Sequence, residues 1–311
     1  MRAFAGVTDR EWYQFLSNQK GLDEVNFWQP SGGSIFKSLA PGELFLFKLK
    51  KSNMIAGGGF FAHSTLLPLD LAWDSFGIAN GAASFGELKR LIDARREKKP
   101  TGTNNYVIGC VLLSQPFFLP PAEWIEIDWK SNIVQGKGYD LTQEPGLSIF
   151  SRIRSALTRS TAEASWPSLI QDLPQDPRER YGQPVLVKPR LGQGTFRVLV
   201  TDAYDRRCAV SSEKVLPVLE AAHIKPYVVE GPHRVDNGIL LRSDLHILFD
   251  RGYLTVAPDL RLQVSNRIHE EFNNGKAYYA FNGSPLRPPR RPEHKPSAEF
   301  LQWHNEQVFR G

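Results

Sequence analysis

The sequence predicts an α+β protein of two domains, and three observations lead to this prediction. Between residues 41 and 113, short aromatic and aliphatic runs alternate with glycine- and proline-containing turns, which is typical of β-strands. Between residues 140 and 192, prolines interrupt any long regular element. At 311 residues the chain is long enough to bury two cores. We therefore place a strand-rich domain at 1–148, a proline-rich linker with a short helix at 149–190, and a second domain at 191–311.

The first half of the chain is expected to be mostly strands. Thr8 and Glu11 have the spacing of a capping box, which predicts a short amphipathic helix after Thr8. Strands are predicted over 44–49, 55–62 and 107–113, with a helical region between the last two. The triple glycine inside the second of these strands indicates a bulge or a close approach of another backbone.

The second half alternates between helix and strand patterns. A helix is predicted over 194–204, two strands near 253–256 and 262–264, and a last helix over 298–308. The basic, proline-rich segment 286–296 has two interpretations. It is either an extended arm along DNA phosphates or a surface connection to the last helix.

Composition limits the classes of function. A net charge of +5 mildly favours a polyanionic partner. Two cysteines exclude a disulfide scaffold and a four-cysteine zinc site. The sequence has neither an N-terminal signal pattern nor an apolar run of membrane-spanning length, so we expect a cytoplasmic protein without a membrane partner.

Three polar residues in the second half have a spacing that points to phosphodiester chemistry. His223 precedes an apolar residue and a proline, Asn237 heads an apolar strand, and His246 lies at the start of a predicted helix. Hydrolysis of a phosphodiester requires a water deprotonated near neutral pH, for which an imidazole is well suited. It also requires positive charge beside the phosphate, which a divalent cation supplies. His246 and Asp250 lie four residues apart, so on a helix they face the same side and are well placed to bind one ion.

This arrangement resembles the HNH nuclease signature. The resemblance implies two strands and a helix folded around one divalent metal ion, with Mg²⁺ or Mn²⁺ as the expected metal. It implies that His223 deprotonates water, that Asn237 fixes the loop and the histidine backbone, and that His246 binds the metal. Many HNH nucleases carry Asp or His directly before the first histidine as a metal ligand, whereas this chain has Ala222 there. Asp250 or Glu220 is the candidate replacement.

The segment before the motif is similar to the corresponding lead of predicted restriction endonucleases with an HNH domain. It runs from Tyr204 through Arg207, Cys208 and Ala209 to Ser211. Related proteins often hold zinc through pairs of cysteines near this position. Because Cys208 stands alone here, no structural zinc is expected.

Residues 1–148 are similar to the PUA-like superfamily, especially its EVE and ASCH-type branches. The similarity rests on an aromatic-glycine loop before a strand, and on the later glycine-rich and apolar strands. It implies a small curled β-barrel with inserted helices, in which an aromatic pocket receives a modified base flipped out of DNA, as in the related SRA domains. Stacking on aromatic rings would offset the cost of flipping. The candidate base- and DNA-binding residues are Asn26, Phe27, Trp28, Gln29, Trp73, Trp129, Asn132 and Gln135.

Within that set, Trp28 is expected to be the accessible ring, because polar residues surround it and a glycine-bounded loop follows. The opposing interpretation is that most of the aromatic residues belong to the core and that 131–137 is an ordinary polar loop. The two resemblances together predict a modification-dependent restriction endonuclease that acts as a homodimer on double-stranded DNA, with cytosine as the expected modified base. The alternatives are a nuclease that reads unmodified or phosphorothioate DNA, and a DNA-binding module whose nuclease half has lost activity.

Overall fold

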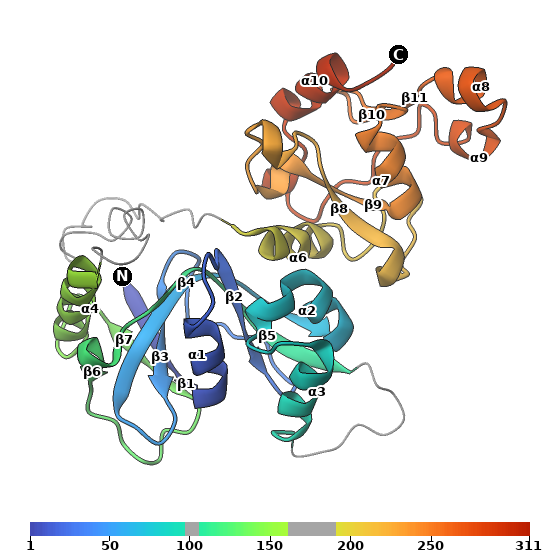
Figure 1. The fold of residues 1–311 in the computed structure, drawn as a ribbon. Helices are drawn as coiled ribbons and strands as arrows, with labels where there is room; N and C mark the ends of the chain where they lie inside the picture. Colours follow the sequence, from blue (N-terminus) through green and yellow to red (C-terminus); the bar gives the residue numbers. More distant parts are fainter. Residues whose placement is uncertain (97–105, 161–190) are drawn as a thin grey trace. The chain divides into compact units, whose positions relative to one another are not determined.

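A computed structural model describes residues 1–96, 106–160 and 191–311 of the protein (Figure 1). The chain divides into two compact units, Met1–Gly192 and Gln193–Gly311. The predicted mixture of helices and strands is confirmed. The five prolines of the predicted linker, from Pro167 to Pro189, lie outside the described residues. None of the described helices is both long and apolar enough to cross a bilayer.

The first unit is built on one mixed sheet. Its strands follow the order β2-β5-β4-β3-β1-β7, and β6 pairs with β4. Of the strand pairs among the described residues, only β1 and β3 run parallel. Among the described residues no pairing joins the end strands β2 and β7, so the sheet is an open path there rather than the expected closed barrel. The strands are β1 (Arg2–Thr8), β2 (Glu24–Gln29), β3 (Leu44–Leu49), β4 (Met54–Pro68), β5 (Val107–Phe118), β6 (Ile125–Glu126) and β7 (Gly136–Asp140).

The triple glycine has the predicted effect on β4. This strand is 15 residues long and shifts its register against β5 on either side of Phe60. A side chain at Gly57 would lie 2.2 Å from the carbonyl oxygen of Phe117, so only glycine permits this approach. The shifts let one long strand bend while it keeps partners on both sides.

Helices cover parts of the sheet. Helix α1 (Arg10–Ser17) is capped by Asp9, whose carboxylate accepts from the backbone N–H of Glu11, and not by Thr8 as the sequence predicted. Thr8 instead ends β1, a strand that the sequence analysis missed. Helix α4 (Gly146–Ser160) crosses the predicted boundary at residue 148 and lies beside β6 and β7 (Figure 1). Its buried face contributes Ile149, Phe150 and Ile153 to the core of this unit. The remaining helical elements are α2 (Leu69–Phe76), η1 (Gly77–Asn80), α3 (Phe85–Asp93) and η2 (Pro121–Glu123).

The second unit is organised around a β-hairpin followed by a helix. Strands β8 (Leu219–His223) and β9 (Gly238–Arg242) pair antiparallel, and α7 (Ser243–Asp250) begins directly after β9. Apolar residues of all three elements share one core with α6 (Gln193–Ala203) and α10 (Ala298–Gln307). The other elements are η3 (Leu216–Val218), η4 (Tyr227–Val229), η5 (Val235–Asn237), β10 (Leu254–Val256), β11 (Leu262–Val264), α8 (Arg267–Phe272), α9 (Lys276–Tyr279) and η6 (Pro292–His294).

The basic segment near the C-terminus follows the surface of this unit. The backbone N–H of Arg287 donates to Ala209, and that of Arg290 donates to Ala203. Two arginine side chains, Arg287 and Arg290, pair with Asp205. This arrangement fits the interpretation of a surface connection to α10 better than that of an extended arm.

Candidate active site

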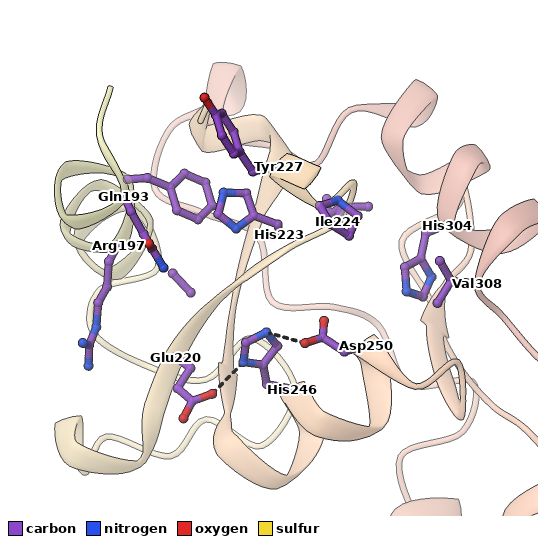
Figure 2. A pocket seen from close by; sticks show the side chains of 13 residues that line it. Gln193, Arg197, Glu220, His223, Ile224, Tyr227, His246, Asp250, His304 and Val308 are labelled. Carbon is purple, nitrogen blue, oxygen red and sulfur yellow. Dashed lines mark hydrogen bonds and ion pairs between the residues drawn. The ribbon is translucent and has the colours of Figure 1, made fainter. Parts of the chain in front are cut away.

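Residues of the hairpin and of α7 form a pocket of about 580 Å³ (Figure 2). His223 lies at the end of β8, and His246 lies in the first half of α7, so the two predicted histidines line the same pocket. Arg197 and Gln193 of α6 line another wall, and Tyr227 lies at the rim. The fold therefore brings His223 and His246 together, although they lie 23 positions apart in the sequence.

Asn237 holds the loop between the two strands. Its side chain is fully buried, and its Oδ1 accepts from the backbone N–H of Lys225 at 2.9 Å. Its Nδ2 donates to the carbonyl oxygens of Lys225 at 2.9 Å and Pro232 at 3.0 Å. Three hydrogen bonds from one buried amide fix the chain at Lys225, two residues after His223. The Asn237 side chain therefore bonds the loop and not the backbone of His223 itself.

The ring of His223 is held by two neighbours. Phe196 of α6 stacks on it with ring centroids 3.8 Å apart and the planes 13° from parallel. Its Nε2 lies 3.0 Å from Nδ1 of His233, which belongs to the loop that Asn237 holds. Gly238 allows this packing, because a side chain there would come within 2.9 Å of the Phe196 ring.

The environment of His223 favours the neutral imidazole. Burial lowers its pKa to about 4, and the charges of His233 and His246 act in the same direction. A ring with this pKa is almost entirely unprotonated at neutral pH. It is therefore in the form that a general base needs before it takes a proton, although so low a pKa also makes the imidazole a weaker base.

His246 lies between two carboxylates, as Figure 2 shows. Its Nδ1 is 2.6 Å from Glu220 Oε2, and its Nε2 is 3.3 Å from Asp250 Oδ2. Burial raises the pKa of Asp250, and Glu220 adds to this effect while His246 opposes it. Glu220 and Asp250, the two candidate replacements for the metal ligand missing at Ala222, thus contact the same imidazole.

The kinds of donor in this cluster fit a divalent cation. Mn²⁺ readily binds both carboxylate and imidazole ligands, and Mg²⁺ binds the carboxylate oxygens. Within 1–96, 106–160 and 191–311, however, no three His, Cys, Asp or Glu side chains already form a metal-binding group. Ala222 is fully buried in the core and is not among the residues that line the pocket.

Residues 208–257 match the family model described as HNH endonuclease. The chain carries an HNH endonuclease domain. The matched segment contains the pocket residues of β8 and α7, including His223 and His246, and it also contains Asn237 of η5. The DNA endonuclease class predicted from the sequence is thereby confirmed for this domain.

One solved structure with a similar segment is named "Modification dependent TagI restriction endonuclease". The similarity has a TM-score of 0.26 and 23% identity, and it covers 36% of this chain and 37% of that chain. It thus spans little more than a third of the length of that protein. No curated protein matches this chain.

Two further residues at or beside the pocket were not predicted from the sequence. His233 contacts His223, and Arg197 lines the wall contributed by α6. His233 lies in a loop without a periodic pattern, and Arg197 lies 26 residues before His223. Arg197 could have been suspected for one reason. It lies on the predicted helix that leads into Tyr204–Ser211, the segment that resembles the lead of HNH restriction endonucleases.

The predicted base-reading residues of the first unit fall into separate places. Trp28 lies on strand β2 rather than on a loop, is only 9% exposed, and donates from Nε1 to the carbonyl oxygen of Asn80. Asn26, on the same strand, is fully buried and donates to the side chain of Asn80. The prediction that Trp28 is the accessible ring on a loop is wrong, because pairing of β2 with the distant strand β5 encloses it.

The other candidates are less enclosed. Phe27 and Gln29 are half-buried on β2, and Phe27 packs against Trp12 and Phe45. Trp73 is half-buried on α2. Trp129 lies on the segment between β6 and β7, and its Nε1 donates to the carbonyl oxygen of Ile133. Asn132 and Gln135 are exposed on that same segment. Three of the candidates, Trp129, Asn132 and Gln135, therefore lie between β6 and β7.

Proposed function

We propose that the pocket of the HNH domain hydrolyses DNA phosphodiesters with a divalent metal ion. The observation that carries this proposal is the placement of a neutral, ring-stacked His223 across one pocket from His246 and its two carboxylates. In this proposal His223 takes a proton from the attacking water. Arg197 lines the same pocket and would place positive charge near the phosphate.

HNH nucleases generally depend on a divalent metal. In this chain His246 and Asp250 would hold the ion, and Glu220 is the third candidate. When bound, such an ion supplies positive charge to the phosphate and to the leaving oxygen. Phe196 and His233 would keep the His223 ring oriented during the proton transfer.

The test is incubation of the full chain with plasmid DNA and Mg²⁺ or Mn²⁺, with EDTA as the control. Plasmids that carry methylated, hydroxymethylated or phosphorothioate DNA are compared with unmodified plasmid. Cleavage that needs the metal supports the nuclease. No cleavage of any plasmid with either metal would instead favour a DNA-binding module whose nuclease half has lost activity.

Replacing Asn237 by Ala is expected to destabilise the second unit by about 2–4 kcal/mol, because each of three hydrogen bonds contributes roughly 0.5–1.5 kcal/mol. It should also reduce cleavage per folded molecule, because the loop that carries His233 loses its anchor. Urea unfolding and single-turnover cleavage measure the two effects.

The matched control for this change is Asn305→Ala. Asn305 donates to the carbonyl oxygens of Val256 and Leu301 and is not among the residues that line the pocket. It should lose stability but keep its cleavage rate. If both variants cleave equally well once folded, Asn237 has only a structural role.

We further propose that the first unit reads a modified base, with modified cytosine as the expected target, and that it does so as a PUA-like domain that accepts a flipped base. The segment between β6 and β7 supports this, because it carries the half-buried Trp129 together with the exposed Asn132 and Gln135. A base can stack on an indole while amide groups bind its edge. Because the proposed catalytic site would cut one strand, a homodimer would cut both strands.

The full chain carrying His223→Ala should bind modified duplex about ten- to two-hundred-fold more tightly than unmodified duplex, since recognition of one methyl group contributes about 1–3 kcal/mol. Fluorescence anisotropy in EDTA measures this preference. Adding Trp129→Ala should remove most of it. Adding Trp124→Ala, whose indole bonds Leu119 instead, should leave it in place. Equal affinity for every duplex would mean that the first unit does not read modified bases.

A further inference from the structure

The rim of the pocket carries an apolar tip formed by three successive residues. Tyr227, Val228 and Val229 make up the turn η4, and their exposed fractions are 65%, 89% and 43%. Apolar side chains exposed singly are common, but three in a row beside a pocket are not explained by packing.

The backbone of this apolar tip is fixed by local bonds. The N–H groups of Val229 and Gly231 both donate to the carbonyl oxygen of Pro226, at 3.1 and 3.0 Å. A side chain at Gly231 would lie 1.8 Å from the carbonyl oxygen of Lys225, so the turn depends on glycine there. Val228 is therefore held outward by a defined turn.

The tip is joined to the catalytic residues. The Tyr227 ring stacks on His233 with centroids 4.5 Å apart and planes 8° from parallel, and His233 in turn contacts His223. Pro226 and Tyr227 also line the pocket, and Figure 2 shows Tyr227 on the side of the pocket where His223 lies. Because Tyr227 belongs both to the tip and to the pocket lining, nucleotides next to a phosphate bound in the pocket would lie beside the tip.

We propose that the apolar tip is a wedge that enters the groove of duplex DNA beside the scissile phosphate. Val228 would contact sugars and base edges, and the outer face of Tyr227 would pack on a sugar or a base. Apolar side chains act in this way in proteins that open or bend a duplex from the minor groove. Lys225 precedes the tip and Glu230 follows it in the sequence. Arg234 is paired with Asp236, so Lys225 is the cation of this loop that is placed next to the tip in the sequence. This inference rests on the proposed nuclease function.

The test compares Val228→Ser with Val215→Ser. Val215 is also an exposed valine of this unit, at 55%, and lies outside the pocket. Duplex affinity is measured by anisotropy in EDTA over a series of salt concentrations. Val228→Ser should weaken binding about tenfold or more, because burial of a valine side chain is lost. The slope of affinity against salt should stay unchanged, because no phosphate contact is removed. Val215→Ser should bind as the unchanged chain does.

A second measurement separates the wedge from the chemistry. With metal, Val228→Ser should lower kcat/KM on duplex DNA at least tenfold more than on bis-p-nitrophenyl phosphate, which is too small to reach the tip. Equal affinity of the two serine variants for duplex would overturn the wedge. So would a change of oligomeric state caused by Val228→Ser, because the tip would then contact a second copy of the chain. An unchanged chain that cleaves neither substrate would refute the proposed nuclease, while the binding comparison would still decide whether the tip contacts DNA.

Discussion

Replacing His223 by Ala is expected to lower the single-turnover rate of DNA cleavage by about 10²–10⁴-fold, the usual contribution of a general base. The reason is that this unprotonated ring lines the pocket and is oriented by stacking on Phe196. Since burial lowers its pKa to about 4, the ring is unprotonated throughout the neutral range. DNA binding in EDTA should be unaffected, because the change removes no cation.

The matched control is His269→Ala. His269 is exposed on α8 and takes no part in the pocket. It should cleave at the rate of the unchanged chain. If His223→Ala retained more than a few per cent of the activity with metal, another group would have to be the base, and His233 would be the first to examine because it lies 3.0 Å away.

The parts of the site that the sequence predicted are those fixed by local geometry. His246 and Asp250 are four residues apart on one helix, and their contact follows from the helical repeat alone. The turn before β9 likewise follows from the order of Asn237, Gly238 and an apolar strand. The contact of His233 with His223 could not be predicted in this way, because it depends on a loop whose path is set by the bonds of Asn237.

The same distinction applies to the first unit. The strand 44–49 was predicted with its observed bounds, because it is a dense apolar run between turns. Strand β2 was taken for a loop, since its residues Asn26 and Gln29 are polar and its partner β5 lies more than 80 residues away in the sequence. Asn26 is tolerated inside because Asn80 supplies an acceptor for its amide. Long-range pairing of this kind leaves no pattern within a short window of sequence.

Replacing His246 by Ala is expected to raise the metal concentration needed for half-maximal cleavage by about 10- to 100-fold or more, since loss of even an outer partner of a metal ligand costs about that much affinity. His246 contacts both Glu220 and Asp250, so its removal also leaves two carboxylates without the imidazole between them. Part of the activity should return at high Mn²⁺. Titration calorimetry with Mn²⁺ on the full chain measures the affinity independently of cleavage.

The two carboxylates are distinguished by Asp250→Ala and Glu220→Ala, with Asp259→Ala as the control. Asp259 pairs with Arg261 in the turn between β10 and β11 and lies outside this pocket. If Asp250 replaces the ligand missing at Ala222, Asp250→Ala should weaken Mn²⁺ binding as His246→Ala does, while Glu220→Ala should have a smaller effect. The reverse order would assign the ligand to Glu220, because that carboxylate lies on the same strand as the usual position. If neither change altered Mn²⁺ binding, the contacts with His246 would be ion pairs that only orient the ring, and the metal would have to be bound elsewhere.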